Sequence, residues 1–342
     1  MKIAIDKDSI NKVDNKNEYI YVFDKETLEE LLKLNLHCIH KDYIYNVDKN
    51  FTKYNIETID KKWLGDKRNY NFAIIVPNYN NDHGVYKGKT YLQNCIESVL
   101  NQTYKNYYLI IVDDISTDTS IQTIEKYRNK EEYIDKIHLI QNKRKRYNGG
   151  SRNVGIDYAK ENLDVDYICF IDSDDWWKND TVLEHINDKL CNHEMMIIGN
   201  EMLFEDRTTK QYNKFDTYED VYFSINKVWC TAWCRVIRID KIAYFCEDTL
   251  MEDRVWSYKQ ADNCDFNKII NLNEICYVWN RLNTSNSVSM IRGNIWDASA
   301  WCHIGHQLQF RETMKHKEFR NRLDERIQSC IAKANSGIFQ QY

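Results

Sequence analysis

From residue 71 onward, short apolar segments alternate with segments of helical periodicity. The apolar segments cover residues 72–76, 108–112, 137–140 and 167–171. Apolar residues recur at helical spacing in residues 92–100, 121–127, 151–159 and 182–190. Strands without polar alternation are buried on both faces, as in parallel sheets whose strands are joined by helices. The pattern therefore predicts an α/β fold with a mostly parallel, doubly wound sheet.

The length of 342 residues suggests about two domains, at roughly 150 residues per domain. Residues 1–68 read as a small α/β extension of unknown role, with a strand at 19–23, a helix at 27–36 and a charged connection at 61–68. We expect the main α/β domain to cover residues 69–290. Mixed-charge helical patterns then predict a helical C-terminal region over residues 291–342.

Composition and charge limit the cellular compartment and the binding partners that we expect for this chain. The mean hydropathy is −0.68, and no apolar run reaches the roughly 18 residues that a membrane span requires. Asp6 interrupts the apolar start of the chain, and the 11 cysteines are dispersed, as is typical of a reducing compartment. We therefore expect a cytoplasmic protein, with attachment to the membrane surface left open. The net charge of −5 argues against a broad nucleic-acid-binding surface, although residues 143–146 (Lys-Arg-Lys-Arg) form a local basic run.

The loop after the first strand carries Pro77, Tyr79 and Asn80. In doubly wound sheets ligands bind at the carboxyl ends of strands, so this loop is a candidate ligand loop. It has neither the glycine fingerprint of dinucleotide-binding enzymes nor a phosphate-binding loop, which argues against hydride transfer and nucleotidyl transfer. A ring and amide groups suit stacking on a base and bonding to it; a plain turn with a surface tyrosine is the alternative. Pro77, the chain's one proline, is expected to end the strand ladder.

Acidic residues follow the second and fourth strands. Asp113 and Asp114 could accept hydrogen bonds from a ring N–H or a ribose hydroxyl, or could belong to a helix start capped by Ser116 or Thr117. Residues 172–177 (Asp-Ser-Asp-Asp-Trp-Trp) place three carboxylates within four positions. Such carboxylates repel one another unless a cation is present, and oxygen ligands favour Mg²⁺ or Mn²⁺. A solvated acidic turn is the alternative.

Between the third and fourth strands, residues 147–155 combine glycines with an arginine. Gly149 and Gly150 would let the backbone approach a ligand closely, and Arg152 opens a helix on the same side. The guanidinium group matches the paired oxygens of a diphosphate.

Taken together in their order, these segments resemble the family 2 glycosyltransferases, which bind nucleotide sugars on a GT-A fold. The resemblance covers residues 72 to about 290. The segments that carry it are 76–80, 98–104, 112–118, 151–156, 170–177, 233–238, 251–253 and 285–290.

The resemblance implies roles for individual residues. Asp253 corresponds to the family's general base, and Asp172 and Asp174 to the ligands of Mn²⁺ or Mg²⁺, with Asp174 the main one. For Glu252 and Asp253, acids at a helix N-terminus are the alternative interpretation. The residues assigned to binding the nucleotide sugar are Pro77, Tyr79, Asn80, Asp113, Asp114, Arg152, Asp172 and Ser173.

We therefore predict a metal-dependent inverting transferase that moves a sugar from a nucleotide-sugar donor, UDP-linked in the favoured case, to a hydroxyl of a glycan or other acceptor. A surface glycan, a teichoic-type polymer and a lipid-linked oligosaccharide are the expected acceptors. The Q-x-x-R-W signature of processive synthases is absent from the sequence, which favours transfer of a single sugar. The alternatives are a transferase acting on modified bases in DNA, through the basic run, and a non-catalytic nucleotide-sugar-binding protein.

Two departures from the family pattern stand out. Ile115 occupies the position where the second acidic motif usually has glycine, and residues 82–89 lengthen the first loop, where they could contact donor or acceptor. The sequence leaves the sugar, the nucleotide, the acceptor and the role of residues 1–68 open. Amphipathic C-terminal helices suggest a homo-oligomer.

Overall fold

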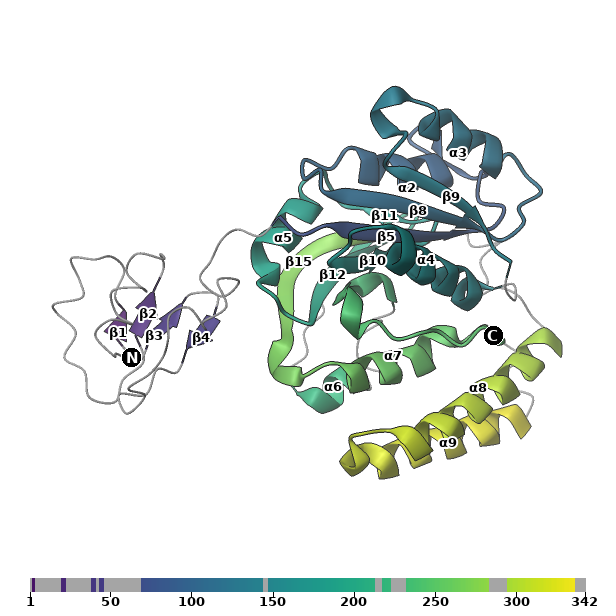
Figure 1. Ribbon diagram of the computed structural model, residues 1–342. Coiled ribbons are helices and arrows are strands. Elements are labelled where there is room, and N and C mark those ends of the chain that lie inside the picture. Colours follow the sequence, from purple (N-terminus) through teal and green to yellow (C-terminus); the bar gives the residue numbers. More distant parts are fainter. Residues whose placement is uncertain are drawn as a thin grey trace. The chain divides into compact units, whose positions relative to one another are not determined.

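The computed structural model describes residues 69–143, 147–212, 217–222, 232–282 and 294–335, together with four short N-terminal strands. The chain divides into two compact units. One unit holds residues 1–69 and 187–192, and the other holds residues 70–186 and 193–342 (Figure 1).

The N-terminal strands form a four-stranded sheet in the order β1-β2-β3-β4. Their bounds are Lys2–Ile3 for β1, Ile20–Val22 for β2, Cys38–His40 for β3 and Tyr43–Tyr45 for β4. The pairs β1-β2 and β2-β3 are parallel, and β3-β4 is antiparallel. The strand predicted at residues 19–23 is thus present as β2, whereas the predicted helix at 27–36 lies outside the described residues.

Four parallel strands form one half of the main sheet, in the order β10-β5-β8-β9. Each corresponds to an apolar segment of the sequence, and each neighbouring pair is parallel. The α/β fold with parallel strands, predicted from the sequence, is confirmed in this half of the sheet. The strands are β5 (Phe72–Asn78), β8 (Tyr107–Asp113), β9 (Ile137–Gln141) and β10 (Tyr167–Phe170).

The other half of the sheet mixes directions, so the whole sheet is mixed rather than mostly parallel. β14 is antiparallel to both β10 and β12, and β12 is parallel to β15. Two further strands pair antiparallel: β11 with β15, and β13 with β12. Because β14 is antiparallel to both of its neighbours, β12 runs in the same direction as β10 and β5. The strands are β11 (Trp176–Trp177), β12 (Met195–Leu203), β13 (Thr208–Gln211), β14 (Arg235–Arg238) and β15 (Ile269–Asn280).

Helices connect and cover the strands, and α4 packs on β5 and β8. The α-helices are α2 (Tyr91–Leu100), α3 (Ser120–Arg128), α4 (Asn148–Asn162), α5 (Val182–Leu190), α6 (Tyr218–Tyr222), α7 (Glu252–Asn263), α8 (Asn294–Thr313) and α9 (Arg320–Asn335). Short 3₁₀ turns are η3 (Glu131–Tyr133), η5 (Ala232–Cys234), η6 (Ile239–Lys241), η7 (Phe266–Lys268) and η9 (Lys317–Phe319). A small hairpin consists of β6 (Val85–Tyr86) and β7 (Lys89–Thr90).

Two local predictions about strand and helix ends are wrong. α3 begins at Ser120 with Thr119 at its N-cap, so neither Ser116 nor Thr117 caps it. β5 continues past Pro77, which pairs in register with Val112 of β8.

Pro77 is tolerated in the β5 strand because its backbone faces the β10 side, where no N–H is needed at this position. Ile75 O accepts a bond from Ile171 N on the β10 side of β5, and Pro77, two residues on, faces the same side. β10 has already ended at Phe170. The missing N–H therefore costs no strand-to-strand bond.

The C-terminal region is helical, as predicted, and α8 contacts both α7 and α9 (Figure 1). Two contacts on one side of α8 reach the loop before α7. Ser299 Oγ accepts a bond from Leu250 N at 2.6 Å, and His306 Nε2 lies 2.5 Å from Asp248 Oδ1. Among the described residues, no helix is both long and apolar enough to cross a membrane.

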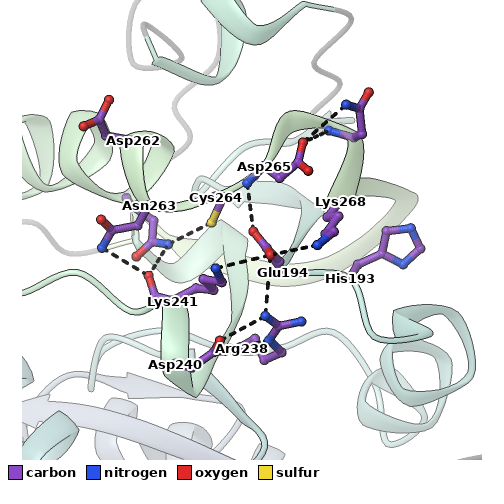
Figure 2. Close-up of polar contacts among 12 residues, drawn as sticks. His193, Glu194, Arg238, Asp240, Lys241, Asp262, Asn263, Cys264, Asp265 and Lys268 are labelled. Carbon is purple, nitrogen blue, oxygen red and sulfur yellow. Dashed lines mark hydrogen bonds and ion pairs between the residues drawn. The ribbon is translucent and has the colours of Figure 1, made fainter. Parts of the chain in front are cut away.

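A buried carboxylate surrounded by cations lies at the amino-terminal edge of the sheet (Figure 2). Glu194 directly precedes β12, and its side chain is only 3% exposed. Its Oε1 lies 3.5 Å from Arg238 Nη2, 3.3 Å from Lys241 Nζ and 3.5 Å from Lys268 Nζ. Its Oε2 accepts a bond from Asp265 N at 2.8 Å. We call Glu194 and its three cations the Glu194 cluster.

Candidate active site

The loops that the sequence marks as ligand loops follow adjacent strands. β10, β5 and β8 are neighbours in the sheet, and the first and second loops meet where Asn78 of β5 pairs in register with Asp113 of β8. The loop after β10 starts alongside β5, because Ile171 N donates to Ile75 O at 3.1 Å. The fold therefore gathers these candidate residues at the carboxyl-terminal edge, opposite the Glu194 cluster.

Asp113 is buried and organises the turn that follows β8. Its Oδ1 accepts bonds from Asn78 Nδ2 at 2.9 Å and Ser116 Oγ at 2.6 Å, while its Oδ2 accepts one from Ser116 N at 2.9 Å. Asp113 thus holds two loops in register. Ser116, assigned to a helix cap from the sequence, belongs to this network instead.

Asp114 is buried beside it and is also bonded to the protein. Its Oδ1 accepts a bond from Asn142 Nδ2 at 2.9 Å, and its Oδ2 accepts one from Tyr147 N at 3.0 Å. A ring N–H of a bound base would be a further donor to the same carboxylate. The network positions the Asp114 carboxylate between the ends of β8, β9 and α4.

Asn80 links the first loop to the second, whereas the neighbouring Tyr79 is exposed. Asn80 N donates to Ser116 Oγ at 2.9 Å, and Asn80 Oδ1 accepts a bond from Thr117 N at 2.6 Å. The role of the Asn80 side chain in this structure is therefore to join loops. Tyr79 presents its ring at the surface of the same edge.

The loop insertion at residues 82–89 is also tied to its surroundings. Asp82 accepts bonds from the hydroxyls of Thr90 at 2.7 Å, Thr119 at 2.7 Å and Thr123 at 2.6 Å, and these bonds help to lower its pKa although burial opposes them. Tyr86 of the hairpin stacks on Trp176, with ring centroids 5.1 Å apart. Contact of this hairpin with donor or acceptor stays a prediction.

Of the three carboxylates after β10, Asp175 is used to anchor the loop. Its Oδ2 accepts a bond from Tyr277 Oη at 2.7 Å, and its Oδ1 accepts one from Asn280 N at 2.7 Å. Tyr277 Oη in turn accepts a bond from Asp172 N at 3.1 Å, and the Tyr277 ring stacks on Trp233 with centroids 4.5 Å apart. Asp175 thus fixes the acidic loop to β15.

Asp174 is partly buried and forms no ion pair with any other residue that the structure describes. Burial, followed by the nearby Asp172, raises the pKa of Asp174 to about 6. Arg281 at the end of β15 lowers that pKa, but the two residues form no ion pair. Asp174 is therefore a carboxylate whose charge the described protein leaves largely uncompensated.

Arg152 connects the acidic loop to the start of α7. Its Nη2 donates to Asp172 Oδ1 at 2.6 Å, and its Nη1 donates to Glu252 Oε1 at 2.7 Å. The guanidinium group is buried, and it lies over the ring of Phe245 at 5.3 Å. Both terminal nitrogens thus already bind protein carboxylates. In this arrangement Arg152 positions the two loops rather than presenting an open fork to a diphosphate.

The two acids at the start of α7 have raised pKa values. Burial raises the pKa of Glu252 to about 7, although Arg152 opposes the shift. Burial also raises the pKa of Asp253, and Asp172 adds to the shift, while Arg254 and Arg152 oppose it. Asp253 therefore lies within the electrostatic reach of Asp172. The structure brings the candidate base and the acidic loop together.

The role expected for Gly149 changes. A Cβ at this position would lie 2.1 Å from Cys246 O and 3.3 Å from Glu252 Cβ. Gly149 therefore permits close approach of the start of α4 to the segment before α7, and not to a ligand. Similarly, a Cβ at Gly155 would lie 2.5 Å from Ile75 Cγ2, so Gly155 lets α4 pack closely on β5.

The sequence profile described as "Glycosyl transferase family 2" matches residues 73–244, just over half of the chain. The chain belongs to this family. The match covers the three ligand loops and Arg152 and stops before α7, so Asp253 and its supporting helix α8 lie beyond it.

Similar proteins include other glycosyltransferases. An uncharacterised glycosyltransferase of Haemophilus influenzae is 38% identical over 128 residues, covering 37% of this chain and 46% of the relative. The putative teichuronic acid biosynthesis glycosyltransferase TuaG of Bacillus subtilis is 29% identical over 139 residues, covering 40% of this chain and 49% of the relative. The chain thus spans about half the length of these relatives. The crystal structure of S. aureus TarS residues 1–349 with UDP has a TM-score of 0.49 at 20% identity, covering 70% of this chain and 65% of that one.

The residues present fit only part of the divalent-cation site that the sequence predicts. Within the described parts of the chain, no three His, Cys, Asp or Glu side chains form a group that could hold a metal by themselves. Asp172 and Asp174 nevertheless offer hard oxygen donors, and within the described parts of the chain Asp174 is not used in an ion pair. Mg²⁺ is usually held by one or two carboxylates together with substrate phosphates. These two residues fit a cation that is shared with a bound nucleotide.

Several residues of the site were missed by sequence reasoning. Tyr277 and Asn280 lie 102 and 105 residues from Asp175, whose carboxylate they contact, so no local pattern could reveal them. Asn142 directly follows β9, and its position after a predicted strand was the available signal. The basic run is mostly outside the described residues, which include only Lys143, so binding of DNA phosphates stays a prediction.

Proposed function

We propose that the protein is a metal-dependent inverting glycosyltransferase that transfers a single sugar from a nucleotide sugar, UDP-linked in the favoured case, to an acceptor hydroxyl. One observation carries most of this proposal. The bridge from Asp172 through Arg152 to Glu252 brings the acidic loop after β10 next to the residue that could act as base, Asp253. The loop proposed to bind the donor and the residue proposed to activate the acceptor therefore lie next to each other.

Asp253 is suited to accept the acceptor's proton. An inverting transfer requires a carboxylate that removes the proton of the hydroxyl as its oxygen attacks the anomeric carbon. The raised pKa of Asp253 makes it a stronger base than an ordinary aspartate. Arg152 holds the adjacent Glu252, and Ser299 of α8 holds the loop before it, so the helix start that carries Asp253 is positioned from two sides.

The departing diphosphate needs positive charge, and Arg152 is the cation that the sequence predicts for it. Arg152 is already paired with two carboxylates. Asp172 and Asp174 would hold Mn²⁺ or Mg²⁺, which when bound supplies the charge that neutralises the leaving diphosphate. Ser173, which accepts a bond from Asn81 Nδ2 at 2.5 Å, keeps the backbone between these two carboxylates in place.

The names of the relatives suggest the acceptor class. They include a protein of teichuronic acid biosynthesis, one of amylovoran biosynthesis and a glucosyltransferase acting on GlcNAc-diphosphoundecaprenol. We propose that the acceptor is a growing cell-surface polysaccharide, a teichoic-type polymer or a lipid-linked oligosaccharide. The choice between a hexosyl and an N-acetylhexosaminyl donor is left to the experiment.

A donor screen tests this proposal. UDP-, GDP- and dTDP-sugars are incubated with the protein and Mn²⁺, and thermal stabilisation and release of the nucleotide are measured. We expect UDP-sugars to stabilise the protein most, and only when Mn²⁺ is present. No response to any donor would refute the proposed function.

The base is tested by Asp253→Asn with the responding donor. We expect turnover to be lost while donor affinity stays within a few-fold of wild type, since the base acts on the acceptor. Asp135→Asn, at an exposed position, is the matched control and should keep full turnover. Full turnover by Asp253→Asn would exclude the assignment. A protein that binds the donor yet never transfers or hydrolyses it would instead be a nucleotide-sugar-binding protein of the same fold.

A further inference from the structure

Ile115 has an unfavourable backbone conformation. It follows Asp114 in the turn after β8, with φ of 63° in the left-handed region. This region is avoided by β-branched residues and readily adopted by glycine. The family pattern indeed has glycine here, so this chain has replaced the residue that fits the turn with one that is strained by it.

The surrounding hydrogen bonds explain why the strain persists. On one side, Asp113 accepts bonds from Ser116 N and Oγ. On the other, both carboxylate oxygens of Asp114 are bonded, to Asn142 and Tyr147. Ile115 lies between two fixed residues and has to take the conformation that the turn requires.

The side chain of Ile115 gains little from packing within the protein. It is 48% exposed, although isoleucine is among the residues that most favour burial. Backbone strain that brings no internal packing is characteristic of functional sites. We therefore expect Ile115 to contribute by contact with a bound ligand rather than by packing within the protein.

Two other exposed side chains with apolar rings start from neighbouring backbone positions. Tyr147 N is bonded to Asp114, the residue before Ile115. Tyr79 precedes Asn80, whose N–H is bonded to Ser116, the residue after Ile115. Tyr79, Ile115 and Tyr147 are all exposed. Three exposed side chains with apolar surface thus start from backbone positions at or beside the turn that carries Asp114.

We propose that Ile115 is a specificity residue of this chain that packs on the nucleobase of the donor. This inference rests on the proposed function, because it takes the ligand to be a nucleoside diphosphate sugar. A base has apolar faces and a polar edge, and the site offers an apolar side chain next to a carboxylate. Ile115 adds contact with the base at a position where glycine would add none, and the strained turn holds it there.

The test uses Ile115→Gly and two ligands, UDP and inorganic pyrophosphate, each with Mn²⁺ and each followed by calorimetry. We expect the variant to melt a few degrees higher than wild type, because the strain is relieved. We expect the Kd for UDP to rise about five- to tenfold, as for loss of part of an apolar side-chain contact. The Kd for pyrophosphate, which has no base, should be unchanged. Ile115→Val should keep UDP affinity.

Ile134→Gly is the matched control. Ile134 is 59% exposed but has an ordinary φ of −57°, so the same substitution should lower the melting temperature and leave both Kd values unchanged. A rise in stability together with weaker UDP binding cannot come from a purely structural role of Ile115.

Three results would overturn the inference: an unchanged Kd for UDP, equal weakening of UDP and pyrophosphate, or a lower melting temperature of Ile115→Gly. Failure of the wild-type protein to bind UDP, GDP and dTDP would refute the proposed function itself, and is thus a distinguishable outcome.

Discussion

The two edges of the main sheet treat buried carboxylates in opposite ways. At the amino-terminal edge, Glu194 is surrounded by three cations and a backbone N–H (Figure 2). At the carboxyl-terminal edge, Asp174 forms no ion pair with another described residue, and burial together with the nearby Asp172 raises its pKa to about 6, although Arg281 opposes the shift. A carboxylate that the protein itself neutralises is part of the architecture. One that is left without a cation is stabilised by what it binds.

The largest expected effect is the loss of activity in Asp174→Asn. Removing the proposed main metal ligand should lower turnover at least about 100-fold, as is found for loss of a group that stabilises transition-state charge. In the metal-free protein at neutral pH the unfolding free energy should rise, by up to about 3 kcal/mol, because a buried charge and its repulsion from Asp172 are removed. Steady-state kinetics measure the loss of turnover, and thermal melting of the same preparation measures the change in stability, with Asp135→Asn as control. Loss of stability together with activity would show that Asp174 is structural.

Glu194→Gln should have the reverse effect. It leaves three cations without their shared carboxylate, and removal of one partner of a buried ion pair costs about 3–5 kcal/mol. Because the cations are partly exposed, we expect about 2–3 kcal/mol of lost unfolding free energy. Turnover of the folded variant should equal that of wild type.

Denaturant titration measures this loss, and Glu131→Gln at an exposed position is the control. A change in donor affinity in Glu194→Gln would mean that the two edges are coupled, against the comparison drawn above.

The dependence of stability on pH should distinguish the edges as well. In the metal-free protein the pKa of Asp174 is raised from 3.8 to about 6, so the folded state binds more protons than the unfolded state between these values. The unfolding free energy should therefore fall as pH rises through this window, by up to about 3 kcal/mol relative to Asp174→Asn. Melting curves of both proteins in EDTA at several pH values measure the difference. Two parallel profiles would contradict the raised pKa.

The smallest expected effect is that of Lys268→Ala. Lys268 is 46% exposed and lies 3.5 Å from Glu194, and exposed ion pairs contribute less than about 1 kcal/mol. Arg238 and Lys241 still neutralise Glu194 in this variant. We expect a loss of about 0.5 kcal/mol in denaturant titration. A loss as large as that of Glu194→Gln would show that Lys268 alone carries the cluster.

Much of the parallel half of the fold was predictable from the chain. The apolar segments became β5, β8, β9 and β10, and the predicted apolar face of α2 is buried as expected. These elements are local, because a buried strand or an amphipathic helix is visible within a short window. The mixed half was not predicted, since the antiparallel placement of β14 between β10 and β12 depends on pairing with strands distant in sequence.

The candidate site divides in the same way. The sequence by itself determined which residue types stand at the strand ends: an aromatic and amide loop, two acidic pairs, an arginine and a second acidic turn. Only the tertiary structure decided which of them are already occupied. Asp175 is bonded to Tyr277 and Asn280, and Arg152 is bonded to Asp172 and Glu252, whereas the carboxylate of Asp174 forms no ion pair with another described residue. The physical reason is that a motif records chemical groups along the chain, while the charge left over for a ligand depends on partners that only folding brings near.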